Sequence, residues 1–354
     1  MCGNGMNGEN TFQKNYEALI SREQLAAWVE GLKENFRLIG PAGGKGEAEF
    51  REVFSFNEIN LDYQSTMLPP GKTFLLKPVE EILSFNVTPG GPVAEEPPLP
   101  DRKRVLFGVH ACDTHAILYL DKVFLGVFPD PFYRARRENT FIFSLNCKTV
   151  SGLCFCHLVG AGPFLKAQSG YDVLLTDMGS EFLVELKSVR AKKIFSLEGR
   201  PPEERDLEKK KELELELLKN FRKDFKADGL REVFLLRPDH PVLKETAEGR
   251  CLSCGNCVMV CPTCFCHDIY DEAGVSLARI KRMRRWDACQ DYFFAKVHGG
   301  NFREERQARL RQFVFHKLDY EGQFGVKGTV GCGRCIRWCP TGIDLTEIAK
   351  EMMK

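Results

Sequence analysis

Ten of the fifteen cysteines in this chain lie between residues 251 and 339, and their spacing indicates what they bind. The first run reads Cys251-x-x-Cys254-x-x-Cys257-x-x-x-Cys261-Pro262. In bacterial ferredoxins, the first three thiolates of such a run bind three corners of one [4Fe–4S] cube, and the fourth binds a neighbouring cube. The proline after the fourth cysteine ends the local helix. This run therefore predicts an iron–sulfur protein that carries single electrons.

A second run, Cys332-x-x-Cys335-x-x-x-Cys339-Pro340, has the same pattern without its first cysteine, because Thr329 occupies that position. Threonine cannot replace a thiolate, so the missing ligand must come from elsewhere, and Cys289 between the two runs is the candidate. Exchange of the fourth ligands then completes two neighbouring [4Fe–4S] clusters. The predicted ligands are Cys251, Cys254, Cys257 and Cys339 for cluster 1, and Cys261, Cys289, Cys332 and Cys335 for cluster 2.

Six cysteines besides Cys2 fall outside these two sets. Two of them each follow a predicted strand at its carboxyl end, where α/β sheets collect their binding sites, and two more lie in the next loop. Four such soft ligands could hold a third [4Fe–4S] cluster, and the alternative is that several are buried apolar thiols. The ligands of this third cluster would be Cys112, Cys147, Cys154 and Cys156, with Cys264 and Cys266 as alternates.

Other chemistries find less support. Structural zinc also uses four cysteines, but its sites usually pair two Cys-x-x-Cys knuckles, which a run ending in Cys-Pro does not match. No Gly-x-Gly-x-x-Gly follows a strand and no Walker A sequence is present. Gly160–Pro163 is a fragment of a nucleotide-binding loop, and it motivates an alternative function in which the protein binds flavin and reduces a small substrate itself. We predict no catalytic residue.

Polar side chains accompany the cysteines. The basic stretch Arg279–Arg285 precedes Cys289 and is either a solvated helix face or a docking surface for an acidic partner such as ferredoxin. We expect the histidines next to the cysteines to donate hydrogen bonds or to pack, rather than to bind iron. These histidines are His110, His115, His157 and His267.

The elements that must position these residues follow from hydrophobic periodicity. Strands are predicted at Arg104–His110 and Thr140–Asn146, with a helix between them that begins at Asp113 or Thr114 and ends near Leu125. Strands that alternate with helices predict an α/β layer. Further predictions are a helix at Tyr16–Phe36, an extended segment at Thr73–Leu76, a hairpin formed by Tyr171–Thr176 and Glu181–Lys187, a connecting helix within Pro201–Asp228, and a helix at Phe302–Leu318.

The fold class predicted from these elements is α+β. An N-terminal α/β domain spans residues 1–238, and an α-helical ferredoxin-type domain with the two clusters spans 239–354. The 354 residues carry 50 Lys and Arg against 49 Asp and Glu, which gives no reason to expect nucleic acid as a partner. We find no membrane-spanning segment and no signal peptide, so we expect a cytoplasmic protein.

Several motifs together resemble one family, the iron–sulfur (beta) subunits of cytosolic NiFe sulfhydrogenases, which are related to an iron–sulfur component of anaerobic sulfite reductase. The resemblance covers nearly the whole chain. It is carried by Leu68-Pro69-Pro70, Phe74–Pro78, Phe107–Asp113, Cys154-Phe155-Cys156, Cys261-Pro262-Thr263-Cys264, Arg285–Cys289, Gly299–Arg303 and Val330–Cys335.

The resemblance implies an electron-transfer subunit within a hetero-oligomer. Such a subunit would relay electrons between a partner that binds flavin and NAD(P) and a catalytic partner, which could be a hydrogenase, a sulfite reductase or a heterodisulfide reductase. This expectation agrees with the residues themselves, which offer cluster ligands and no substrate site.

Overall fold

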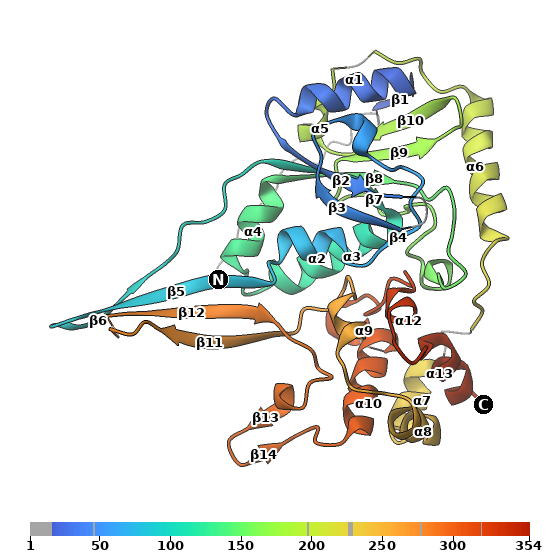
Figure 1. The fold of residues 1–354 in the computed structure, drawn as a ribbon. Helices are drawn as coiled ribbons and strands as arrows, with labels where there is room; N and C mark the ends of the chain where they lie inside the picture. The colour runs from blue at the N-terminus through green and yellow to red at the C-terminus, as the bar shows by residue number, and fades with distance from the viewer. Residues whose placement is uncertain (1–15, 45–46, 197, 226–228, 277, 320) are drawn as a thin grey trace, which may run out of the picture.

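The computed structural model describes residues 16–44, 47–196, 198–225, 229–276, 278–319 and 321–354. Its largest element is an eight-stranded sheet in the order β1-β10-β9-β8-β7-β2-β3-β4 (Figure 1). The four central strands β9, β8, β7 and β2 run parallel. The strands are β1 (Tyr16–Ser21), β2 (Arg37–Ala42), β3 (Glu47–Glu52), β4 (Ser65–Thr66), β7 (Arg104–His110), β8 (Thr140–Leu145), β9 (Val173–Asp177) and β10 (Glu181–Leu186).

Strand β7 shows why the centre of this sheet is buried on both faces. Val105 and Phe107 pack into the core beneath α1 and α5, whereas Leu106 and Val109 pack on the opposite face, beneath α2, α3 and α4. A near-continuous apolar run is typical of such a two-sided parallel strand. The covering helices are α1 (Arg22–Leu32), α2 (Pro70–Leu75), α3 (Ala111–Phe124), α4 (Pro131–Glu138) and α5 (Val189–Ile194).

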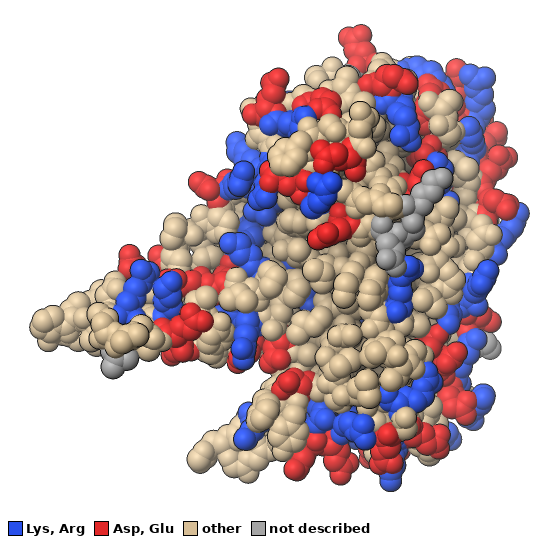
Figure 2. Space-filling model, in the orientation of Figure 1, with Lys and Arg blue, Asp and Glu red and all other residues tan. Residues whose placement is uncertain are grey.

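A second, four-stranded antiparallel sheet in the order β11-β12-β5-β6 projects from the body as an arm (Figure 1). It joins two strands from early in the chain to two strands from the cysteine-rich part. Figure 2 shows cationic and anionic side chains side by side along it. Its strands are β5 (Val79–Thr88), β6 (Gly91–Glu95), β11 (His267–Ala273) and β12 (Arg279–Trp286).

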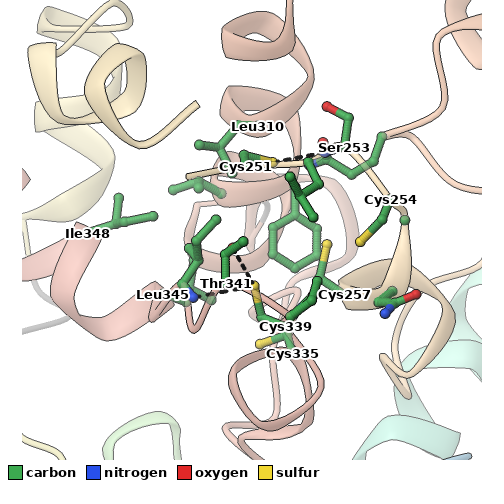
Figure 3. Close-up of a pocket in the computed structure, with 18 residues that line it drawn as sticks. Cys251, Ser253, Cys254, Cys257, Leu310, Cys335, Cys339, Thr341, Leu345 and Ile348 are labelled. Atoms are coloured by element: carbon green, nitrogen blue, oxygen red, sulfur yellow. Dashed lines mark hydrogen bonds between the residues drawn. The ribbon is translucent and has the colours of Figure 1, made fainter. Parts of the chain in front are cut away.

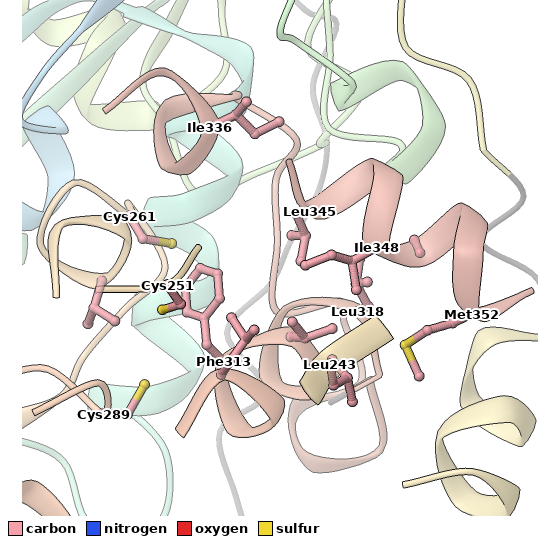
Figure 4. Packing of buried hydrophobic residues seen from close by; sticks show 14 of the residues in the cluster. Leu243, Cys251, Cys261, Cys289, Phe313, Leu318, Ile336, Leu345, Ile348 and Met352 are labelled. Atoms are coloured by element: carbon pink, nitrogen blue, oxygen red, sulfur yellow. The ribbon is translucent and has the colours of Figure 1, made fainter. Parts of the chain in front are cut away.

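The cysteine-rich part packs short helices around one apolar core. Figure 4 shows Phe313 of α10 and Leu345 of α13 next to Cys251, and this core also contains Cys261 and Cys289. The remaining elements are α6 (Glu204–Leu218), α7 (Leu230–Leu236), α8 (Pro241–Gly249), α9 (Asn256–Met259), α10 (Arg306–Leu318), α11 (Glu321–Phe324), α12 (Arg334–Arg337), α13 (Leu345–Met352), β13 (Lys296–Val297), β14 (Gly300–Asn301) and the 3₁₀ turns η1 (Phe56–Glu58), η2 (Cys156–Val159) and η3 (Phe293–Ala295).

Three sequence predictions are wrong. The first part of Tyr16–Phe36 is not helical, because β1 pairs antiparallel with β10 and only α1 is a helix. Thr73–Leu76 is not extended, because Pro70 at the first helical position starts α2. The basic stretch Arg279–Arg285 is not a helix face, because it forms β12 between two partner strands.

Other elements confirm the predictions. Strands β7 and β8, the hairpin of β9 and β10, the connecting helix α6 and helix α10 lie where the sequence places them. Helix α3 begins earlier than expected, with His110 at its N-cap and no side-chain cap. The mixed α/β composition is confirmed, although β11 and β12 show that the cysteine-rich part is not wholly helical. The domain boundary after residue 238 stays a prediction.

Every helix in the described part of the chain is too short or too polar to cross a lipid bilayer.

Candidate functional site

The predicted ligands of cluster 1 line one cavity. Cys251, Cys254, Cys257 and Cys339 surround a common space, and Figure 3 shows their side chains together with Cys335. The rest of the lining is mainly apolar and comes from α10 and α13. Cys251 is buried whereas Cys254 is exposed, so this site opens to the surface at Cys254.

Backbone geometry shapes the loop that carries these thiols. Ser253 has φ +52° and Gly255 has φ +79°, which curl the chain before the short helix α9. Ser253 N–H lies 3.4 Å from Cys251 Sγ, and Ile343 N–H lies 3.3 Å from Cys339 Sγ. Burial would raise the pKa of Cys339, but hydrogen bonds led by the Thr341 hydroxyl outweigh it and lower that pKa. These bonds favour the thiolate, which is the form that binds iron.

Three of the four predicted ligands of cluster 2 also meet. Cys261, Cys332 and Cys335 line a second cavity together with Lys317 and Phe155. Burial raises the pKa of Cys332 to about 11. Because Cys335 also lines the first cavity, the two sites are neighbours, as the exchange of fourth ligands requires.

The fourth predicted ligand of cluster 2 lies elsewhere. Cys289 does not line the second cavity, and its thiol is hydrogen-bonded to Cys266, whose pKa falls to about 7 through that bond. Cys264 is bonded instead to Cys261. Cys264 is therefore an equally close candidate, and the assignment of Cys289 to cluster 2 stays a prediction.

The four cysteines proposed for a third cluster are also neighbours, and we call them site 3. Cys112 opens α3 after β7, Cys147 follows β8, and the other two lie just before and at the start of η2. Burial raises the pKa of Cys156, and the sulfurs of Cys147 and Cys154 raise it further. Burial also raises the pKa of Cys112, to which Cys332 of the cluster 2 site contributes.

Two glycines allow the cluster 2 loop to approach site 3 closely. Phe155 N–H donates to Gly331 O at 2.8 Å, and Gly331 has φ +64°. A Cβ on Gly331 would lie 2.5 Å from the Cys156 nitrogen, and a Cβ on Gly333 would lie 2.5 Å from Leu153 O. Only glycine fits these positions, so the motif around Cys332 is built for this contact.

A buried ion pair spans the same boundary. Arg334 donates to Asp113 at 2.7 and 2.8 Å, and both side chains are almost fully buried. Arg334 also donates to Thr66 through two nitrogens. The pair ties the loop that carries Cys335 to the turn after β7 that carries Cys112.

Two buried lysines lie beside the cluster 2 site. Lys317 donates to Thr263 Oγ1, and Lys72 donates to the carbonyl oxygen of Val258 in the first cysteine run. Burial would lower the pKa of Lys317, but the thiolates of Cys261 and Cys264 raise it above its usual value.

The sequence predictions did not include Lys72, Lys317 or Arg334. Helical spacing could have indicated Lys317, since Leu310, Phe313 and Val314 place it on the buried face of α10. Nothing in the sequence marks Lys72, because its contacts come from residues far along the chain. Arg334 is part of a motif that carries the resemblance, but its partner Asp113 is known only from the fold.

The histidines next to the cysteines pack or bond elsewhere. His110 is buried and stacks on Tyr63 at 3.9 Å, and burial lowers its pKa to about 4. His157 lies against Phe221, and His267 Nδ1 is 3.1 Å from Phe265 O. In the described part of the chain, none of these three has a hydrogen bond to a sulfur atom.

The cations of the basic stretch are balanced by carboxylates in and around the arm. Such pairing leaves little net charge for an acidic partner, so docking through this stretch stays a prediction, and the fold weakens it. The pairs are Arg279 and Lys281 with Glu81, Arg282 with Asp271, Arg284 with Glu80 and Asp130, and Arg285 with Asp268.

These residues suit iron–sulfur clusters, because soft thiolates line two enclosed cavities and accept hydrogen bonds from backbone N–H groups. Among the residues that the structure describes, no group of three or more His, Cys, Asp or Glu side chains is placed to hold one metal ion.

Comparison with known proteins agrees with this chemistry. Residues 250–343 match the family model of the 4Fe-4S dicluster domain, which defines the class as an iron–sulfur protein. The chain is 37% identical over 338 residues to sulfhydrogenase 2 subunit beta of Pyrococcus furiosus, and the match covers 94% of this chain and 97% of that protein. The chain therefore belongs to the family of sulfhydrogenase beta subunits, as the motifs predicted. No solved structure matches it.

Proposed function

We propose that this chain is the electron-relay subunit of a sulfhydrogenase-type complex, in which it passes single electrons between [4Fe–4S] clusters. The observation that carries the proposal is the continuity of the cysteine sites. Cys254 reaches the surface, Cys335 lines both cavities, and Cys332 adjoins Cys112 of site 3. Thiols thus extend from the protein surface to the edge of the large sheet.

The chemistry of each step belongs to the clusters, which accept and release one electron at a time. The chain contributes the thiolates, the N–H groups that donate to them, and an apolar surround that excludes water. Cluster 1 is proposed to be bound by Cys251, Cys254, Cys257 and Cys339, and cluster 2 by Cys261, Cys332, Cys335 and either Cys289 or Cys264.

We propose that site 3 binds a third cluster. Support comes from four thiols that influence one another's pKa and lie at the carboxyl ends of β7 and β8, where α/β sheets bind ligands. Burial alone would also suit unreactive thiols, so the distinction must come from iron content. Two cubes contain about eight irons per chain and three contain about twelve.

The experiment is anaerobic iron and sulfide analysis of the purified chain, together with electron paramagnetic resonance after reduction. Cys147→Ser should lower the iron content from about twelve towards eight if site 3 binds a cube, since each cube holds four irons. Cys254→Ser should perturb cluster 1 and serves as the matched ligand variant. Iron content of four or below in the unmodified protein would contradict the relay.

The partners we propose are a flavin- and NAD(P)-binding subunit on one side and a hydrogenase-type catalytic subunit on the other. The name of the Pyrococcus furiosus relative, a beta subunit of a sulfhydrogenase, supports membership of such a complex. Co-purification from the native source would identify the partners.

The alternative, a flavin site at Gly160–Pro163, loses support from the geometry. A Cβ on Gly162 would lie 3.0 Å from Cys156 Sγ and 3.6 Å from Ala111 Cβ, so this loop closes over site 3. Flavin retained by the isolated subunit would revive the alternative.

A further inference from the structure

Lys317 brings a positive charge to the lining of the second cavity. Its side chain is 1% exposed, and its Nζ donates to Thr263 Oγ1 at 2.9 Å and to Gly328 O at 3.0 Å. Both acceptors are neutral oxygens. In the described residues, no carboxylate forms a salt bridge with Lys317.

Lys72 approaches the same site from the large sheet. Its side chain, from α2, is 0% exposed, and its Nζ donates to the carbonyl oxygens of Val258 at 3.1 Å and Met259 at 3.3 Å. It also lies over the ring of Trp286, 4.4 Å from the centroid. No salt bridge to a carboxylate joins it within the described part of the chain either.

Two buried ammonium groups without a counter-charge are unusual, because an unpaired buried charge is strongly disfavoured. The negative groups nearest to both are the sulfurs of Cys261 and Cys264. A cube bound by thiolates carries net negative charge, and its reduction adds one more. The lysines therefore have their counter-charge only when the cluster 2 site is loaded, and the attraction is stronger in the reduced state.

The other two sites differ in charge. In the described residues, no charged side chain lines the cluster 1 cavity, although Arg306 donates to Cys251 O and Arg309 to Ser253 Oγ at its edge. Site 3 has a balanced pair in Arg334 and Asp113. Unbalanced buried positive charge is thus concentrated at cluster 2.

We propose that Lys317 and Lys72 hold the transferred electron at cluster 2, by stabilising the reduced state of that site over the oxidised state. The inference rests on the proposed relay function and assigns these two residues a tuning role within it. It does not depend on whether Cys289 or Cys264 completes the ligand set, because both lysines are placed relative to Cys261.

The test is a redox titration of the whole chain followed by electron paramagnetic resonance, with Lys317→Met and Lys72→Met as separate variants. Methionine keeps an unbranched apolar side chain and removes the charge. For Lys317→Met we expect at least a tenfold fall in the ratio of reduced to oxidised cluster 2 at a fixed ambient potential, which is about 59 mV for one electron. Lys72→Met should shift the same ratio in the same direction.

Three controls make the result specific. Lys317→Arg retains the charge and should keep the midpoint close to that of the unmodified protein. Lys244→Met removes an exposed lysine from α8 and should shift neither cluster. Cys254→Ser alters an exposed ligand of cluster 1 and so identifies which signal belongs to cluster 2.

Unchanged midpoints in both methionine variants would overturn the inference and leave the relay function intact. An equal shift in Lys244→Met would also overturn it, since the effect would not be local. If Lys317→Met does not assemble, Lys72→Met decides alone, because that side chain contacts only backbone oxygens and one ring. An unmodified chain without reducible clusters would refute the proposed function itself.

Discussion

At the scale of single residues, the pair of Arg334 and Asp113 is the best-defined link between the cluster 2 site and site 3. Both side chains are nearly inaccessible, and Thr66 satisfies further guanidinium nitrogens. A buried pair of this kind is costly to break from one side, because the remaining partner keeps its charge without compensation.

Asp113→Asn should therefore lower the free energy of unfolding by about 3–5 kcal/mol, since it leaves the Arg334 guanidinium buried without a counter-charge. The measurement is anaerobic urea unfolding of the cluster-loaded protein. Asp271→Asn is the matched control, because its pair with Arg282 is exposed and should contribute no more than about 1 kcal/mol. Equal effects of the two substitutions would contradict the role assigned to burial.

The contact between Gly331 and Cys156 gives a second prediction at this scale. Gly331→Ala places a methyl group where the Cys156 backbone lies and forces a left-handed conformation on alanine, which costs about 1–3 kcal/mol before any clash. We expect lower iron content per chain after anaerobic reconstitution. Gly300→Ala, where a Cβ meets nothing within 4 Å, should leave the iron content unchanged.

Spacing along the chain was sufficient to predict which cysteines line the first cavity, because a loop that binds one cube uses ligands close in sequence. It was not sufficient for Cys289, which contacts Cys266 through the pairing of β11 with β12. Lys72 was missed for the same reason, since its partners lie 186 and 187 residues further along the chain.

At the scale of elements, Glu80 joins the arm to the body. This carboxylate is buried and forms salt bridges with Arg136 of α4 and Arg284 of β12. Its neighbour Glu81, on the other face of the strand, pairs with Arg279 and Lys281, which are both largely exposed. Two adjacent glutamates on one strand thus occupy opposite electrostatic environments.

Glu80→Gln should destabilise the protein by about 3–5 kcal/mol, because two guanidinium groups lose the charge that balances them. Glu81→Gln should cost no more than about 1 kcal/mol, since its partners are solvated. Hydrogen exchange would show whether protection is lost first in β5 and β12. A larger effect at Glu81 than at Glu80 would contradict this account.

Elements with strong local signals were predicted and the others were not. Strand β7 is a continuous apolar run, and its position followed from sequence alone. Strand β12 carries five cations in a row of eight residues, which resembles a solvated helix until its carboxylate partners on β5 and β11 are known. Strand β1 has apolar residues that also fit helical spacing, and only pairing with β10 decides between the two.

At the scale of the whole molecule, the cysteines are part of the core as well as ligands. Cys251, Cys261 and Cys289 belong to the same buried cluster as Phe313 and Leu345. Metal binding is coupled to folding where ligands and core coincide. Removing the iron should therefore loosen the cysteine-rich part more than the large sheet.

Anaerobic chelation of iron followed by hydrogen exchange checks this expectation. Protection should fall in α8, α10 and α13 and persist in β7 and β8, which are buried by aliphatic and aromatic side chains alone. Uniform loss across all five elements would indicate one cooperative unit. Full retention in α10 would show that the core does not need the clusters.

The arm has a consequence for how such proteins can be recombined. Because β5 and β6 come from the first half of the chain and β12 hydrogen-bonds to β5, a cut between the halves would leave a ribbon on each side with an open edge. A graft of the ferredoxin-like portion onto another scaffold would have to carry the β5–β6 ribbon with it. Gene fission between residues 96 and 266 would likewise yield two fragments that must find each other through this ribbon before either is complete.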